Sequence, residues 1–160
     1  MKLDNNDFGQ IIKHTPLLSI DLIVRSRDGR ILLGQRRNRP AQHYWFVPGG
    51  RVRKDERLED ALHRIATAEL GKPVRDGVLL GVFEHFYEDN ALELPGVSTH
   101  YVVVGYQCTI ADDAIATTDE QHAGFQWWPL DALLRSEAVH DNTKAYFSAT
   151  PINGFQSRQG

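Results

Sequence analysis

The segment FVPGGRVRKDERLEDALHRIATAELG, from Phe46 to Gly71, constrains the fold of this chain more than any other. A short strand ends at a Pro-Gly-Gly turn, and an amphipathic helix then runs to a glycine, which commonly follows the last turn of a helix. On a period of about 3.6 residues, Leu58, Leu62 and Ile65 lie on one stripe of this helix. The next position of the stripe is Glu69, so the sequence predicts a carboxylate on the face that packs against the core.

Two interpretations of Glu69 follow. A glutamate near the end of a helix commonly reaches solvent, and Glu69 would then carry no chemistry. Alternatively, Glu69 belongs to a ligand site. Gly49 and Gly50, in the turn that precedes the helix, let the backbone approach a ligand closely, and an exposed carbonyl there is a hard oxygen ligand. A carbonyl and a carboxylate are half of a Mg²⁺ site, and Mg²⁺ commonly binds together with substrate phosphates. The second interpretation therefore predicts a metal site at this helix.

Size and composition fit one domain of an ordinary globular protein. The chain has 160 residues, of which 41% are apolar and 24% charged, and these values are typical of a globule. A net charge of −3 argues against general binding to nucleic acid or to an anionic membrane. Cys108 is the only cysteine, which excludes a disulfide framework and favours a reducing compartment. Since MKLDNNDFGQ has no apolar leader, we expect a cytoplasmic single domain over residues 1–160, with a loose tail from about 151 to 160.

Strand signals dominate the rest of the chain. We expect strands at LLSIDLIVRS, RILLGQRR, HYWFVPG, VLLGVFEHFY, THYVVVGYQC and FQWW. The Asp28-Gly29 step between the first two predicts a hairpin. Helices are expected at Leu58–Leu70, with Asp55 as N-cap, and near LDALLRS and NTKAYFSA. This order of elements predicts an α+β fold in which a mixed β-sheet lies between α-helices.

The opening segment resembles the motif of the Nudix hydrolases, GX5EX7REUXEEXGU, in which U is aliphatic. The residues in register are Gly50, Glu56, Arg64, Ala66, Glu69 and Gly71. Three positions depart, because Ile65 and Ala68 replace two glutamates and Lys72 replaces the last aliphatic residue. Typical family members use those glutamates to hold several metal ions and often to activate water. Their loss predicts a single ion, and a base that comes from elsewhere in the chain.

Within the family, the chain is similar to the GDP-mannose mannosyl hydrolase branch. The segments that carry this similarity are HTPLLSIDLIV, LLGQRRNRPAQHYWFVPGGRVRKDE, EHFYEDN, THYVVVGY and DEQH, and they extend to about Phe147. The resemblance implies a Nudix α/β/α fold, a homodimer, and a nucleotide-sugar substrate. It implies hydrolysis of GDP-α-D-mannose, with GDP-glucose as a second substrate, to GDP and β-D-mannose. Water would attack the anomeric carbon with inversion, whereas ordinary Nudix enzymes direct it to phosphorus.

The resemblance also implies a metal site and a base. One Mg²⁺ per subunit, replaceable by Mn²⁺, would be held by the Gly49 carbonyl, the Glu69 carboxylate and the Gln121 amide oxygen. Diphosphate oxygens would complete the coordination. His122 would be the general base, because a histidine accepts a proton at neutral pH. From the residues alone, Gln121 and His122 are ordinary loop side chains, and that alternative stays open.

Three arginines are candidates to bind the diphosphate. By resemblance, Arg36, Arg51 and Arg64 would neutralise the departing GDP, and a guanidinium suits a phosphate because it binds in a bidentate manner. For Arg64, an ion pair with Glu56 is a competing interpretation. Tyr101 would donate its hydroxyl to a phosphate, or it is a half-buried strand tyrosine.

Asp21 interrupts the apolar run SIDLIV, where an unpaired carboxylate is unfavourable. Either it pairs with an arginine for structural reasons, or it faces the site. The resemblance places Asp21 and His85 near the sugar and the glycosidic oxygen. Two other functions stay open, namely a conventional Nudix pyrophosphohydrolase that attacks phosphorus and a catalytically inactive sensor of nucleotide sugars.

Overall fold

The computed structural model describes residues 2–112 and 122–148, with only the backbone at 122 and 123. The strands in these residues form two sheets. The larger sheet has the order β4-β1-β6-β5, and these strands are Gly49–Arg51, Leu17–Val24, Thr99–Ile110 and Val74–Tyr87. Strand β1 runs parallel to β6, whereas β4 and β5 are antiparallel to their neighbours. The smaller, antiparallel sheet has the order β3-β2-β7, made of Trp45–Phe46, Ile31–Arg36 and His122–Trp128.

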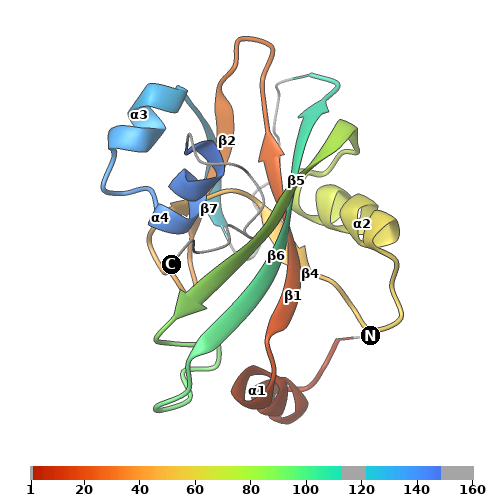
Figure 1. Cartoon of the computed structure of the whole chain (residues 1–160), viewed down its shortest axis with the longest axis vertical. Coiled ribbons are helices and arrows are strands. Elements are labelled where there is room, and N and C mark those ends of the chain that lie inside the picture. Colours follow the sequence, from red (N-terminus) through yellow and green to blue (C-terminus); the bar gives the residue numbers. More distant parts are fainter. Residues whose placement is uncertain (1, 113–121, 149–160) are drawn as a thin grey trace, which may run out of the picture.

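Helices lie on both sides of the larger sheet (Figure 1). Helix α2 (Leu58–Leu70) covers one face, and α3 (Leu130–Arg135) and α4 (Asp141–Lys144) lie on the opposite side, where a 3-10 turn at Ala145–Phe147 follows α4. This arrangement confirms the expected α+β class with helices on both sides. The expected single sheet is divided into two. None of the helices in the described part of the chain is long and apolar enough to cross a membrane.

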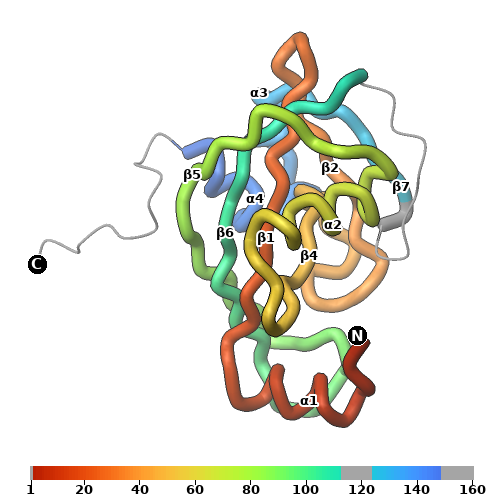
Figure 2. Tube along the Cα trace, turned by 90° about the vertical axis from the view of Figure 1, so that its right-hand side faces the viewer, coloured from red at the N-terminus to blue at the C-terminus, as the bar shows by residue number. Residues whose placement is uncertain are grey.

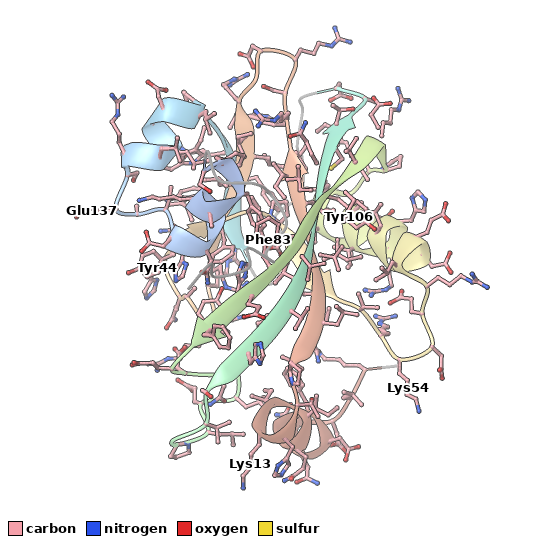
Figure 3. The ribbon with its side chains drawn as sticks, in the orientation of Figure 1. Lys13, Tyr44, Lys54, Phe83, Tyr106 and Glu137 are labelled. Carbon is pink, nitrogen blue, oxygen red and sulfur yellow. The ribbon has the colours of Figure 1, made fainter. Side chains whose placement is uncertain are left out.

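Two core clusters use the two faces of β1. Ile20, Leu22 and Val24 face α2, where they pack in one cluster with Ile65, whereas Ile23 belongs to the second cluster on the other side. This alternation follows from the two-residue period of a strand. Figure 3 shows the same division in the neighbouring strands, because Tyr106 lies on the α2 side and Phe83 on the α4 side. The odd-numbered positions Ser19 and Asp21 therefore face away from α2.

Two strand predictions need correction. Residues 25–31 form the expected turn, closed by an Arg25–Ile31 bridge and by the Ser26 N–H donating to the Arg30 carbonyl at 2.9 Å. Beyond the turn, however, β1 and β2 join different sheets. The expected strand HYWFVPG is likewise divided, since Trp45–Phe46 pairs in the smaller sheet and Gly49–Arg51 in the larger. The proline between them separates the two pairings.

Helix α2 ends as predicted but begins differently. Gly71 adopts a left-handed conformation with φ of 69° and donates its N–H to the Thr67 carbonyl, which confirms the predicted end. Asp55 is not the N-cap. The N-cap is Arg57, without a side-chain hydrogen bond, and Asp55 itself has φ of 63°. Leu58 is 39% exposed, so the buried face of the helix consists of Ala61, Ile65, Ala66, Glu69 and Leu70.

An additional helix, α1 (Asn5–His14), was not expected from the sequence. Its N-cap is Asp4, whose carboxylate accepts a hydrogen bond from the Asp7 N–H at 2.8 Å. Figure 2 shows α1 beside the loop between β5 and β6. The contact is close, since a Cβ atom at Gly9 would lie 3.3 Å from Leu94.

Candidate active site

A cleft opens on the face of the larger sheet that lies away from α2. Its cavity volume is about 90 Å³, and the cleft opens to solvent. Strands β1, β4, β5 and β6 supply one wall, and Phe46 and Arg36 from the smaller sheet contribute to the other. The lining residues are Ser19, Asp21, Arg36, Pro40, Phe46, Val47, Gly49, Gly50, Arg51, His85, Tyr87 and Tyr101.

Asp21 lies in this cleft and is only 8% exposed. Its backbone pairs with Gly49 of β4 on one side and with Gly105 of β6 on the other. A side chain at Gly49 has no room, because its Cβ atom would overlap Asp21 Oδ1 and lie 2.6 Å from the Ile20 carbonyl oxygen. The Pro-Gly-Gly turn of the sequence therefore brings the backbone of Gly49 directly against the Asp21 carboxylate.

His85 and Tyr146 complete a buried polar group around Asp21. The Tyr146 hydroxyl donates to Asp21 Oδ2 at 2.5 Å and lies 3.5 Å from Nε2 of His85. His85 is 4% exposed; burial, and to a smaller degree the nearby His140, lowers its pKa to about 4. His85 is therefore neutral at pH 7. A neutral imidazole beside a carboxylate suits recognition of hydroxyl groups.

The cationic side of the cleft is formed by two arginines. Arg36 donates from Nε to the Pro40 carbonyl at 2.9 Å, which fixes its guanidinium near the cleft. The Arg51 guanidinium lies over the ring of Phe8 from α1, 3.9 Å from the ring centroid. Tyr101 lines the same cleft, and burial raises its pKa. Its phenol thus remains a hydrogen-bond donor at neutral pH. These groups form a site suited to an anion.

Arg64 does not line this cleft. Its Nε donates to Glu56 Oε1 at 2.6 Å and its Nη2 donates to Glu56 Oε2 at 2.9 Å, so the ion pair that competed with phosphate binding is present. A second hydrogen bond from Nη2 reaches the Arg51 carbonyl at 2.8 Å. Arg64 thereby connects α2 to strand β4 at Arg51. Its predicted contact with phosphate remains a prediction.

The residues proposed for the metal ion are placed in part. Glu69 is 7% exposed on the buried face of α2, one turn after Ile65, and Ile65 contacts Gly50. Such a carboxylate requires donors or a cation nearby. A peptide carbonyl at Gly49 and the Glu69 carboxylate are hard oxygen donors, so these residues fit Mg²⁺. Among the side chains that the structure describes, in residues 2–112 and 124–148, no three of His, Cys, Asp or Glu are grouped to hold a metal.

The remaining predicted residues belong to the segment before β7. Gln121 lies outside the described residues. His122 is described as the first residue of β7, and its backbone pairs with Arg36 of the cleft. The chain therefore enters the smaller sheet beside the cleft at the residue predicted as the base. The orientation of its side chain is not part of the described structure.

Two residues near the site were not expected from the sequence. Tyr146 belongs to the segment NTKAYFSA, in which a tyrosine is an ordinary core residue, and its partner Asp21 is 125 positions away. Phe8 lies in α1, which was itself not expected. For Tyr146, the only sequence signal was the buried carboxylate at Asp21, which requires a donor from some other element.

Known proteins support the reading of the motif. Residues 15–149 match the NUDIX domain family. The chain is 42% identical over 123 residues to the low-salt glycan biosynthesis protein Agl8 of Haloferax volcanii, covering 76% of each chain. It is 30% identical over 99 residues to the ADP-ribose pyrophosphatase of Methanocaldococcus jannaschii, covering 62% of this chain and 58% of that protein.

Solved structures share the fold. The MutT NUDIX hydrolase of Burkholderia pseudomallei has a TM-score of 0.68 at 27% identity, over 86% of this chain and 100% of the other. The MutT protein of Methanosarcina mazei Go1 also has a TM-score of 0.68, at 22% identity, over 84% of this chain and 92% of the other. Together with the motif in register and the two-sheet fold, these matches show that the chain belongs to the Nudix hydrolase family.

Proposed function

We propose that this protein hydrolyses GDP-α-D-mannose to GDP and β-D-mannose, with GDP-glucose as a second substrate. Nudix hydrolases bind nucleotide-derived substrates and generally use Mg²⁺ or Mn²⁺. One observation carries the proposal. Ile65 occupies a position at which the Nudix motif has a glutamate. It is 1% exposed and packs against Gly50, since a Cβ atom added to Gly50 would lie 3.1 Å from Ile65 Cγ1. That position serves the core, which leaves the reaction without one of the carboxylates suited to phosphorus attack.

The reaction is attack of water on the anomeric carbon. A bond forms between the water oxygen and C1, the bond from C1 to the bridging oxygen breaks, and its electron pair leaves with GDP. Attack from the face opposite GDP inverts the configuration, as in inverting glycosidases. His122 takes the proton of the attacking water. GDP is a good leaving group when its developing negative charge is neutralised, so a protonating acid is not required.

The cleft supplies the other roles. Arg36, Arg51 and Tyr101 bind the diphosphate and stabilise the charge that grows on the bridging oxygen, with Arg64 supporting Arg51 through the Arg51 carbonyl. Asp21 and His85 bind the sugar beside the glycosidic oxygen.

The Gly49 carbonyl, Glu69 and Gln121 would hold one Mg²⁺ or Mn²⁺, which contributes Lewis-acid stabilisation of the diphosphate. By the same resemblance, the protein is proposed to act as a homodimer in the cytoplasm. The similarity to the glycan biosynthesis protein supports a sugar-linked substrate.

The position of the isotope after reaction in ¹⁸O-labelled water tests the proposal. We expect GDP and labelled mannose when the purified protein is incubated with GDP-mannose and Mg²⁺. The anomer formed first, observed by proton NMR before mutarotation, should be β. Label in a phosphate product, or the appearance of mannose 1-phosphate, would refute attack at carbon. Absence of turnover of any nucleotide sugar would favour the inactive sensor.

A second candidate is a pyrophosphohydrolase that attacks phosphorus. The similarity to an ADP-ribose pyrophosphatase favours it, because that enzyme's substrate is also a nucleoside diphosphate linked to a sugar. The same labelled-water reaction separates the two, since this alternative predicts GMP and a sugar phosphate.

The role of His122 is tested by His122→Gln. We expect kcat to fall by at least about 100-fold while Mg²⁺-dependent binding of GDP survives, because general-base catalysis contributes roughly 10²–10⁴-fold. His63→Gln, on the exposed face of α2, is the matched control. Unchanged turnover in His122→Gln would remove His122 as the base.

A further inference from the structure

A row of glycines crosses the larger sheet at Asp21. Asp21 pairs with Gly49 and Gly105, and Gly105 pairs in turn with Gly81 of β5. Directly paired residues in a sheet point their side chains to the same face. Asp21 is therefore the only residue of this row with a side chain on the cleft face. The missing side chains at Gly49 and Gly105 make room for the Asp21 carboxylate and for the ring of Tyr146.

The ring of Tyr146 occupies the space beside Gly105. A Cβ atom at Gly105 would lie 3.3 Å from Tyr146 Cε1 and 3.2 Å from Phe83 Cε2. Tyr146 and Phe83 make an edge-to-face contact, with centroids 4.7 Å apart and an interplanar angle of 78°. Figure 3 shows Phe83 on this side of the sheet, toward α4. Tyr146 lies in the 3-10 turn after α4 and is 6% exposed. This turn therefore places the Tyr146 hydroxyl beside the buried Asp21 carboxylate.

The proton on each group follows from the donors and acceptors available. The Tyr146 hydroxyl has one proton, and the 2.5 Å distance assigns it to Asp21 Oδ2, because a carboxylate can only accept. The hydroxyl oxygen can then interact with His85 only as an acceptor, at 3.5 Å from Nε2. This arrangement favours the Nε2–H tautomer of His85 and leaves Nδ1 as an acceptor. Burial supports both states, since it raises the pKa of Tyr146 and lowers that of His85 to about 4.

We propose that Tyr146 is a positioning residue that holds Asp21 and His85 as a pair of hydrogen-bond acceptors for the hydroxyl groups of a sugar. The inference rests on the proposed function and extends it, because it assigns the orientation of the proposed sugar-binding pair to Tyr146, a residue that the proposed function does not use. The diphosphate side, at Arg36 and Arg51, does not involve Tyr146. Tyr146 should therefore influence binding of a nucleoside diphosphate sugar and leave binding of the nucleoside diphosphate unchanged.

The test compares the affinities of GDP-mannose and GDP by calorimetry, in the presence of Mg²⁺ and in a His122→Gln background that suppresses turnover. We expect His122→Gln to bind GDP-mannose more tightly than GDP, and Tyr146→Phe to reduce that preference by about 10-fold or more, since a hydrogen bond to a charged group is lost. Tyr106→Phe is the matched control, because Tyr106 lies on the opposite face of the sheet. It should leave both affinities unchanged.

A double-mutant cycle distinguishes positioning from packing. If Tyr146 acts through Asp21, then Tyr146→Phe should change the preference by less than about 2-fold when Asp21→Asn is already present. Should Tyr146→Phe fail to fold, Gly105→Ala replaces it, because it crowds the ring but keeps the hydroxyl, and the preference should again fall.

Failure of the inference differs from failure of the proposed function. Four outcomes would overturn the role of Tyr146. The preference for GDP-mannose over GDP could be the same with and without Tyr146→Phe, or the effects of Tyr146→Phe and Asp21→Asn on it could be additive. Tyr146→Phe could weaken the binding of GDP as much as that of GDP-mannose, or the His122→Gln protein could bind the two ligands equally. These outcomes are read from binding alone. Attack at carbon is judged separately, from the position of the ¹⁸O label.

Discussion

The ion pair between Arg64 and Glu56 yields a prediction that combines stability and activity. The guanidinium contacts both carboxylate oxygens, at 2.6 and 2.9 Å, and Glu56 Oε2 also accepts from the Arg53 N–H at 2.9 Å. Because Arg64 in addition donates to the Arg51 carbonyl, the pair connects α2 to strand β4, which carries the cleft residue Arg51. Replacing Glu56 by Gln removes the charge and keeps the shape.

The magnitude follows from the pKa of Glu56. The hydrogen bond from Arg64 lowers that pKa from 4.5 to about 2. A depressed carboxylate pKa contributes stability above pH 4.5, and this contribution is lost as the pH falls toward 2. A shift of about 2.5 corresponds to roughly 3.4 kcal/mol at most. The carboxylate lies near the surface, where water screens the pair, so about 1 kcal/mol is expected.

Urea denaturation of wild type and Glu56→Gln between pH 7 and pH 3 measures this contribution. We expect the free energy of unfolding to differ by about 1 kcal/mol at pH 7, and the difference to shrink below about pH 4.5. Effects of other titrating groups cancel in the difference. Glu59→Gln, an exposed carboxylate of the same helix, is the control. A difference that stays constant with pH would refute the electrostatic reasoning.

The same variant decides how Arg64 affects catalysis. If Arg64 acts only by holding β4, Glu56→Gln and Arg64→Gln should lower kcat/KM by factors within about 10-fold of each other, because Glu56 orients the guanidinium that donates to the Arg51 carbonyl. If Arg64 also reaches a phosphate, Arg64→Gln should cost at least about 10-fold more than Glu56→Gln, since charge-assisted contacts to phosphate are strong. Equal loss in the two variants would exclude the contact with phosphate.

Further predictions concern Gly49, Phe8 and His85. Gly49→Ala should lower the free energy of unfolding by about 2 kcal/mol or more in urea denaturation, because the added Cβ atom would lie 2.6 Å from the Ile20 carbonyl oxygen. Gly124→Ala is the control, since nothing lies within 4 Å of its Cβ position, and it should change the free energy of unfolding by less than about 0.5 kcal/mol. Phe8→Leu should weaken calorimetric binding of GDP about 2- to 5-fold, because it removes the ring 3.9 Å from the Arg51 guanidinium; equal affinity would exclude this role of α1. In the folded state His85 has a pKa of about 4, whereas in the unfolded state it takes up a proton below about pH 6.5. As the pH falls from 6.5 to 4, the free energy of unfolding of wild type should therefore decrease by up to about 3 kcal/mol relative to that of His85→Gln. Parallel stability curves for the two proteins would contradict this.

The parts of the fold that could be predicted depend on local signals. The stripe on α2 and the glycine after it are encoded within one segment, and both the helix and its end were located correctly. Helix α1 was not, and the contact that it makes is distant in sequence, since Gly9 lies against Leu92 and Leu94 of the loop between β5 and β6. A local pattern does not contain such a contact, and helices in proteins gain most of their stability from tertiary packing.

The division into two sheets illustrates the same limit. An Asp-Gly turn brings two strands together at the turn, and this local part was correct. It does not determine how far the strands remain paired, which depends on competing partners. Strand β1 pairs with β6 from Leu17–Tyr101 to Val24–Cys108, and residues more than 80 positions apart cannot be paired from a local pattern.

Within the site, the sequence located charges more readily than their partners. Asp21 was conspicuous because a carboxylate in an apolar strand is unfavourable, and Arg36, Arg51, His85 and Tyr101 do line the same cleft. The donor to Asp21 was not identified. Tyrosine is common in cores, and nothing in its neighbours indicates that its hydroxyl reaches a strand near the other end of the chain.

Gly49 joins the two halves of the proposed chemistry. Its peptide carbonyl is a candidate ligand of the metal ion, and its missing side chain admits Asp21 Oδ1 on the wall where the sugar is proposed to bind. The next residue, Gly50, receives Ile65 from α2, the residue that replaces a metal-binding glutamate of the motif. Ile65 therefore packs α2 against β4 at the motif position where typical family members have a metal-binding glutamate. On this view, the core contact and the proposed attack at carbon in place of phosphorus have one structural origin. Ile65→Val keeps an apolar contact and should preserve the proposed attack at carbon, whereas a labelled phosphate product from that variant alone would show that the core contact and the site of attack are independent.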